Sequence, residues 1–187
     1  MITIRNATPD DAPAIIAFQR AMAMETEGME LKNDVITKGV MAVFHDDTRG
    51  RYYVAEEHGA VVASLMITYE WSDWRNANIW WFQSVYVIPD YRRKGVFTMM
   101  YDHVKQDGMA QGIAGLRLYV ESENIRAQKT YEAMGMNGAH YRTFEWMVYQ
   151  AAGLPYIIYK NVLADHTRCR LFHWNTYPVA DCPRKAG

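Results

Sequence analysis

Apolar and polar residues alternate along several short stretches of the chain, as they do in strands with one buried face. Residues 79–88 differ, because they are almost continuously apolar and aromatic, which indicates a strand in the middle of a sheet. Pro89 ends this strand because proline cannot donate a hydrogen bond to a ladder. The pattern predicts strands at residues 2–6, 51–56, 60–71, 79–88, 116–121 and 139–148.

Elsewhere, apolar residues recur every three or four positions, which is the period of a helix that buries one face. Thr8-Pro9-Asp10-Asp11 is a good helix start, because threonine caps, proline fits the first position and acids favour the positive end. Gly28 ends this first helix. Further helices are predicted from residue 33, over residues 95–107, and over residues 124–134 before the stop at Gly135.

These elements follow the order strand, two helices, three strands, helix, strand, helix, strand. The three consecutive strands are joined by polar segments at residues 57–59 and 72–78, which favours an antiparallel meander. The later strands alternate with helices, which favours parallel crossover packing. We therefore predict an α/β protein of mixed α+β type. Its central sheet is mixed and mostly antiparallel, with helices on both faces.

The last part of the chain does not continue this pattern. Residues 155–159 are typical of one more strand, and the segment after them is mixed in character. We expect one domain over residues 1–149 and a C-terminal extension over 150–187. The extension is open to three interpretations: an extra strand, a dimer arm or a tail. Edge strands and this extension are compatible with a homodimer.

Composition narrows the class of protein. Half of the 187 residues are hydrophobic and 22% are charged, as in soluble globular proteins. The net charge is −1 and the sequence pI is about 6.6, so we expect no nucleic-acid partner. No apolar run approaches the roughly 20 residues that cross a bilayer, and the N-terminus lacks the pattern of a secretory signal. We expect a cytoplasmic protein with no membrane partner.

Metal-binding patterns are missing from the sequence. The two cysteines, Cys169 and Cys182, have no zinc-site spacing, and the six histidines are scattered. We therefore expect no metal.

The most informative segment begins with Arg92-Arg93-Lys94-Gly95-Val96-Phe97. This basic turn with a glycine lies between an apolar strand and a helix. Such a turn directs backbone N–H groups and the positive end of a helix at one point, which favours a phosphate or pyrophosphate. An ordinary solvated basic turn is the alternative. The turn predicts a phosphate-bearing cofactor.

A second motif follows about thirty residues later. Asn124, Ala127, Tyr131 and Gly135-Met136 lie on a predicted strand–turn–helix segment. With the basic turn and the order of elements, this motif resembles the GNAT superfamily of acyl-CoA N-acyltransferases. The resemblance covers residues 2–148. Phe97 stands where the family usually has a small residue, and Met136 where it usually has phenylalanine. The aromatic stretches at residues 70–75 and 80–87 look like a bacterial branch of this superfamily.

The resemblance implies a sheet splayed at strands 4 and 5, and an N-acetyltransferase that uses acetyl-CoA (coenzyme A). A primary amine of a small molecule or peptide would attack the thioester directly in a ternary complex. A non-catalytic acyl-CoA-binding sensor or interaction module is the alternative. The resemblance implies these cofactor-binding residues: Val85, Tyr86, Val87, Arg92, Arg93, Lys94, Gly95, Val96, Phe97, Thr98, Asn124, Ala127 and Tyr131.

Tyr131 is the candidate general acid. A phenol with a pKa near 10 can protonate a thiolate whose conjugate acid has a pKa near 8.5. Without the motif, a tyrosine on an amphipathic helix is commonly a packing residue, so both interpretations stay open.

The base and the acceptor site are less defined. Glu70, at the end of the third strand, is the catalytic base candidate, and a solvated surface carboxylate is the alternative. Glu25 and Glu27 lie in the first helix, which lines the acceptor site in this family, and would attract a cationic amine. Trp71 and Trp74 are candidates for an aromatic wall around that amine, with core packing as the alternative.

Overall fold

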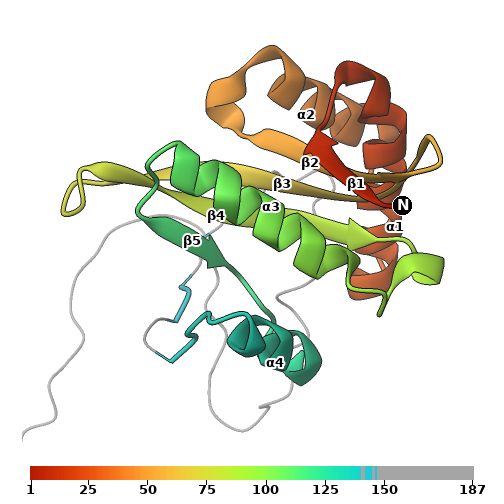
Figure 1. The fold of residues 1–187 in the computed structure, drawn as a ribbon. Coiled ribbons are helices and arrows are strands. Elements are labelled where there is room, and N and C mark those ends of the chain that lie inside the picture. Colours follow the sequence, from red (N-terminus) through yellow and green to blue (C-terminus); the bar gives the residue numbers. More distant parts are fainter. Residues whose placement is uncertain (140–141, 145, 147–187) are drawn as a thin grey trace, which may run out of the picture. The chain divides into compact units, whose positions relative to one another are not determined.

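A computed structural model describes residues 1–139, 142–144 and 146, and Figure 1 shows its fold. The observed elements are β1 (Thr3–Asn6), α1 (Ala12–Glu27), α2 (Asn33–His45), β2 (Arg51–Glu57), β3 (Ala60–Ser72), β4 (Ala77–Val87), α3 (Val96–Ala110), β5 (Gly115–Leu118) and α4 (Ile125–Ala133). Each corresponds to an element that the sequence predicts.

The five described strands form one sheet in the order β1-β2-β3-β4-β5. The first four pair with their neighbours in antiparallel fashion, and β4 pairs with β5 in parallel. The parallel pair is joined through α3, as a crossover connection requires. The predicted mixed, mostly antiparallel sheet is therefore confirmed.

Each face of the sheet packs against different helices. Along β2, Tyr53 belongs to the core that α3 covers with Met100 and Val104. The next residue, Val54, belongs to a second core with Ile15 of α1 and Val40 of α2. Successive side chains of a strand point to opposite faces, so α3 lies on one face and α1 and α2 on the other (Figure 1). This confirms helices on both faces.

Several predicted boundaries differ from the structure. The loop predicted at 72–78 is shorter, because the β3–β4 ladder continues to the pair Ser72–Ala77 and leaves a turn at residues 73–76. Its polar residues reflect exposure at the tip of a long hairpin. The strand predicted over 116–121 ends at Leu118, where its pairing with β4 stops. Half of the residues of the strand predicted at 139–148 are described, namely 139, 142–144 and 146, and none of these is in a strand. The strand predicted at 155–159 and the extension 150–187 lie outside the described residues.

Gly50 provides a test of this fold. It precedes β2 with φ of 143°, and a Cβ there would collide with the carbonyl oxygen of Ile67 in β3. We expect Gly50→Ala to lower the free energy of unfolding by about 2–4 kcal/mol, from backbone strain and overpacking together. Urea unfolding followed by circular dichroism measures the change.

Gly39→Ala is the matched control. Gly39 lies inside α2, and a Cβ there would meet nothing within 4 Å. Alanine favours a helix interior over glycine by about 1 kcal/mol, so this variant is expected to be at least as stable as the parent. Equal unfolding midpoints for the two variants would contradict the close approach at Gly50.

Candidate functional site

The last two strands of the described sheet, β4 and β5, pair along only part of their length. The β4–β5 ladder runs from Ile79–Gly115 to Phe82–Leu118, and β4 then continues to Val87 with only β3 beside it among the described residues. Within the described residues, no strand pairs with that side of Gln83–Val87. An unpaired strand edge presents N–H and C=O groups that need partners. The gap is therefore a place where an extended ligand could take backbone hydrogen bonds.

A bulge lies at the start of this unpaired segment. Ser64 pairs with Tyr86 and Met66 pairs with Gln83, so Leu65 faces two residues of β4. One of them, Ser84, has φ of 52°, which few residues other than glycine adopt. Bulges of this kind bend a strand and often lie beside functional sites. Here the bulge accompanies the departure of β4 from β5.

Backbone alternation shows which groups face the gap. The N–H of Ile88 donates to the carbonyl of Val62 on the β3 side, at 3.1 Å. Adjacent residues of a strand point their polar groups in opposite directions, so the groups of Val87 face the open side. Val85 is the second residue of the bulge, and Tyr86 points its ring to the α1 face, where it contacts Phe18.

The basic turn follows β4. After a 3-10 turn at Pro89–Tyr91, Arg93 has φ of 62° and Gly95, the N-cap of α3, has φ of 76°. No side chain among the described residues caps this end of α3. The first N–H groups of the helix therefore point outward beside Arg93 and Lys94, an arrangement that attracts an anion.

One cavity joins the turn to the second motif. It has a volume of about 460 Å³ and lies between the end of β4, the turn and α4. Nine residues predicted to bind the cofactor line it: Val87, Arg92, Arg93, Gly95, Val96, Phe97, Thr98, Ala127 and Tyr131. The fold thus brings together the two motifs that the sequence separates.

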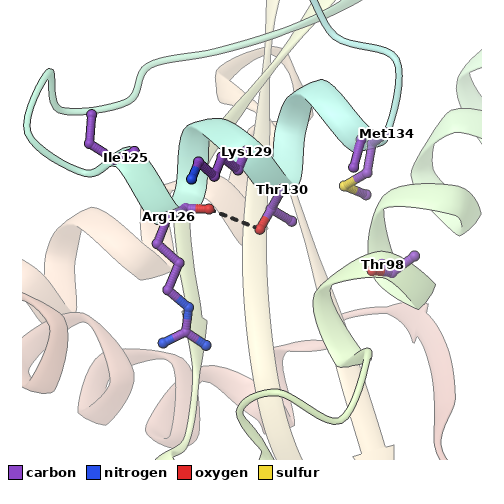
Figure 2. A pocket seen from close by; sticks show the side chains of 7 residues that line it. Thr98, Ile125, Arg126, Lys129, Thr130 and Met134 are labelled. Carbon is purple, nitrogen blue, oxygen red and sulfur yellow. Dashed lines mark hydrogen bonds between the residues drawn. The ribbon is translucent and has the colours of Figure 1, made fainter.

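Sequence reasoning missed part of this region. Arg126 and Thr130 of α4 line the cavity, and with Lys129 they also line a neighbouring groove of about 830 Å³ between α4 and Thr98 of α3. Figure 2 shows the Arg126 guanidinium extending away from α4, while the Thr130 hydroxyl donates to the Arg126 carbonyl at 3.1 Å. The sequence signal for them was helical spacing, because Arg126 and Thr130 lie four residues apart and so share one face of α4.

Tyr131 is half-buried in the cavity wall. Burial raises the pKa of its phenol above the usual value of 10. Its ring meets Phe97 edge-on, with centroids 5.7 Å apart, and Phe97 also contacts Phe82 and Tyr101. The large side chain of Phe97 therefore packs into the core and not across the turn.

Some predicted residues lie elsewhere. Glu70 pairs with Ile79 in the ladder, six residues before Val85, which is on the order of 20 Å along β4. Its carboxylate accepts hydrogen bonds from Arg117, at 2.6 Å, and from the indole of Trp81, at 2.6 Å. The structure does not bring Glu70 to the gap.

The remaining predicted acceptor residues are also separated from the gap or already paired. Trp71 and Trp74 are 60% and 90% exposed at the β3–β4 hairpin, beyond the end of β5. Glu27 is exposed at the end of α1. Glu25 lies two residues earlier in α1, and its carboxylate accepts hydrogen bonds from Tyr86 and Arg92. Of this group, only Glu25 contacts the unpaired end of β4, through Tyr86.

Comparisons with known proteins agree with this geometry. The model of the acetyltransferase (GNAT) family matches residues 18–136, more than half of the chain. The chain belongs to this family. Family members use acetyl-CoA as the acyl donor, and acyl transfer is the class of activity that membership supports. The predicted resemblance and fold class are confirmed.

Individual relatives support the same assignment. A possible acetyltransferase from Clostridium difficile 630 has 47% sequence identity and a TM-score of 0.74, over 80% of this chain and 99% of that one. A predicted acetyltransferase from Clostridium acetobutylicum, solved with acetyl-CoA, shares the fold at 17% identity and a TM-score of 0.62, over 80% of this chain and 96% of that one. A curated thialysine N-epsilon-acetyltransferase from Bos taurus is 32% identical over 75 residues, which is 40% of this chain. The match spans only 44% of that relative's length.

Among the described residues, no helix is both long and apolar enough to cross a membrane. The same residues contain no group of three or more His, Cys, Asp or Glu side chains that could hold a metal ion.

The start of α4 can be tested without any ligand. The Asn124 side chain accepts a hydrogen bond from the N–H of Ala127, at 3.1 Å, and caps this helix. We expect Asn124→Ala to destabilise α4 by about 1 kcal/mol, seen as faster amide hydrogen exchange over residues 125–133. Asn124→Asp keeps a capping oxygen and should exchange like the parent. Unchanged exchange in Asn124→Ala would show that the cap does not hold α4.

Proposed function

We propose that the protein is an acetyl-CoA-dependent N-acetyltransferase that acetylates a primary amine of a small molecule or peptide. The observation that carries the proposal is the cavity that joins the basic turn to Tyr131 beside the unpaired edge of β4. A turn suited to phosphates, the end of the open strand edge and a phenol therefore lie around one cavity. Acyl transfer from a thioester of coenzyme A needs these three elements.

The residues present fit that donor. Arg93, Lys94 and the first N–H groups of α3 suit its phosphates, because Gly95 turns the backbone through a left-handed conformation at the N-cap. The outward-facing N–H of Val87 suits an amide-bearing arm laid along β4, while its carbonyl oxygen accepts from Arg92. When bound, acetyl-CoA supplies an activated acetyl group as a thioester.

The reaction proceeds by direct attack. The neutral amine nitrogen bonds to the acetyl carbon, the carbon–sulfur bond breaks, and the sulfur leaves as a thiolate. Tyr131 donates its phenolic proton to that thiolate, and the nitrogen loses one proton to give the amide. Burial raises the pKa of Tyr131, so the phenol is protonated at neutral pH and can act as a proton donor. Backbone N–H groups of β4 would stabilise the carbonyl oxygen as it gains charge.

The acceptor of the amine's proton is open. The role of Glu70 as the base stays a prediction. Its distance from Val85 along β4 and its bonds to Arg117 and Trp81 favour a structural role. The roles of Trp71, Trp74 and Glu27 in amine binding also stay predictions.

Calorimetric titration with acetyl-CoA tests the cofactor site. Gly95→Pro should weaken binding at least about tenfold, because proline fixes φ near −65° and removes an N–H, whereas Gly95 has φ of 76°. Gly95→Asn is the control, since asparagine tolerates the left-handed region and keeps the N–H. Circular dichroism establishes that both variants fold. If wild type does not bind acetyl-CoA, the proposed function is wrong.

The role of Tyr131 is tested by turnover. Thiol release with a library of amines identifies an acceptor and separates an enzyme from an acyl-CoA-binding sensor, which would bind without turnover. Tyr131→Phe should then lower kcat by about 10²-fold or more while acetyl-CoA still binds, because only the proton donor is removed. Tyr119→Phe, a tyrosine that does not line the cavity, serves as the control. An unchanged kcat in Tyr131→Phe would exclude this residue as the acid.

A further inference from the structure

Arg92, the first residue of the basic turn, directs its side chain towards α1. Its Nη2 donates to Oε2 of Glu25 at 2.7 Å, and its Nε donates to the carbonyl oxygen of Val87 at 2.8 Å. Its guanidinium carbon lies 5.2 Å from the centre of the Tyr86 ring. A phosphate at the turn would have to compete with these bonds for the guanidinium.

Glu25 closes the set of contacts from the other side. Its second carboxylate oxygen accepts a hydrogen bond from the hydroxyl of Tyr86 at 2.7 Å. Tyr86 is only 7% exposed and packs on Phe18 of α1. The Tyr86 hydroxyl and then Arg92 hold the pKa of Glu25 below its usual value, so the carboxylate stays charged. Glu25, Tyr86 and Arg92 come from α1, β4 and the turn, so they connect three elements.

These contacts lie where the shape of β4 matters most. Tyr86 and Val87 belong to the segment beyond the bulge, which has no strand on its open side within the described residues. With one ladder only, that segment depends on other contacts to hold its position. Arg92 supplies one directly through the Val87 carbonyl, and a second through Glu25 and Tyr86.

We propose that Arg92 is a positioning residue that, with Glu25 and Tyr86, fixes the end of β4 against the last turn of α1. The phosphates are then left to Arg93, which lines the cavity, and to the first N–H groups of α3, while the Lys94 ammonium lies 5.1 Å from the centre of the Tyr91 ring. This inference rests on the proposed function for its kinetic consequences. The proposal gives Arg92 a positioning role, whereas the sequence motif alone places it among the phosphate ligands.

The magnitude is expected to be moderate. The Arg92 and Glu25 side chains are each 41% exposed, and an exposed ion pair alone contributes little. Arg92 also contacts the Val87 carbonyl and the buried Tyr86 ring, so these contacts together should stabilise the end of β4 more than the ion pair alone. We expect the loss of one member to lower kcat/KM by about three- to tenfold.

The experiment compares two acyl donors, acetyl-CoA and S-acetylpantetheine, which lacks the phosphates. A side chain that binds phosphate contributes only to the reaction with acetyl-CoA. Its removal therefore lowers the ratio of kcat/KM for acetyl-CoA to kcat/KM for S-acetylpantetheine. A positioning residue matters for both donors, so its loss lowers both values and leaves their ratio unchanged. We expect Arg92→Gln to behave in the second way and Arg93→Gln in the first. A ratio lowered by Arg92→Gln as much as by Arg93→Gln would overturn the proposal.

The Glu25 partnership has its own test. Glu25→Gln should reproduce the effect of Arg92→Gln on both donors, and the double variant should lose no more than either single variant, since both break one set of contacts. Fully additive losses would overturn the partnership.

Amide hydrogen exchange gives a readout that needs no turnover. Arg92→Gln and Glu25→Gln should both speed exchange in the last turn of α1 and at residues 86–88, and Arg93→Gln should not. If wild type turns over neither donor, the proposed function fails, and this measurement alone decides the positioning role. Equal exchange in Arg92→Gln and Arg93→Gln would then reject it.

Discussion

The parallel ladder between β4 and β5 includes only four residue pairs, and the candidate site depends on where it stops. A strand in the middle of a sheet normally satisfies its polar groups on both sides. Past Phe82, β4 keeps only its β3 partner among the described residues, and a bulge at Ser84 accompanies its departure from β5. The resulting edge is short and ends at a cavity lined by residues of α3 and α4, which favours a ligand over a second sheet.

The helix that follows β4 completes the site. The turn at Arg93 and Gly95 reverses the chain through two left-handed residues and starts α3 with uncapped N–H groups. Because the turn follows β4 directly, the anion site and the open edge are adjacent by connectivity. Their geometry relative to each other is then fixed by the α3 core at Val96, Met100 and Val104.

Much of this could be predicted from the sequence because the signals were local. The period of the apolar residues predicted the strands and helices, and the positions of glycine and proline predicted where several of them end. The phosphate turn and the α4 motif were also local, and connectivity brings them together. Side-chain pairing between distant elements was not local. Nothing in the sequence shows that Glu70 meets Arg117 across the sheet, or that Arg92 binds Glu25, 67 positions earlier.

Phe97 shows how core packing reaches the chemistry. A small residue is usual at this position in the family, and a large one at the start of α3 would be expected to crowd the turn. Its ring instead enters the core beside Phe82 and Tyr101, and its outer edge meets Tyr131. Edge-to-face contacts between aromatic rings are directional and worth about 0.5–1.5 kcal/mol beyond burial. The phenol of Tyr131 therefore contacts the same side chain that anchors the start of α3, so one packing contact connects the basic turn to the candidate proton donor.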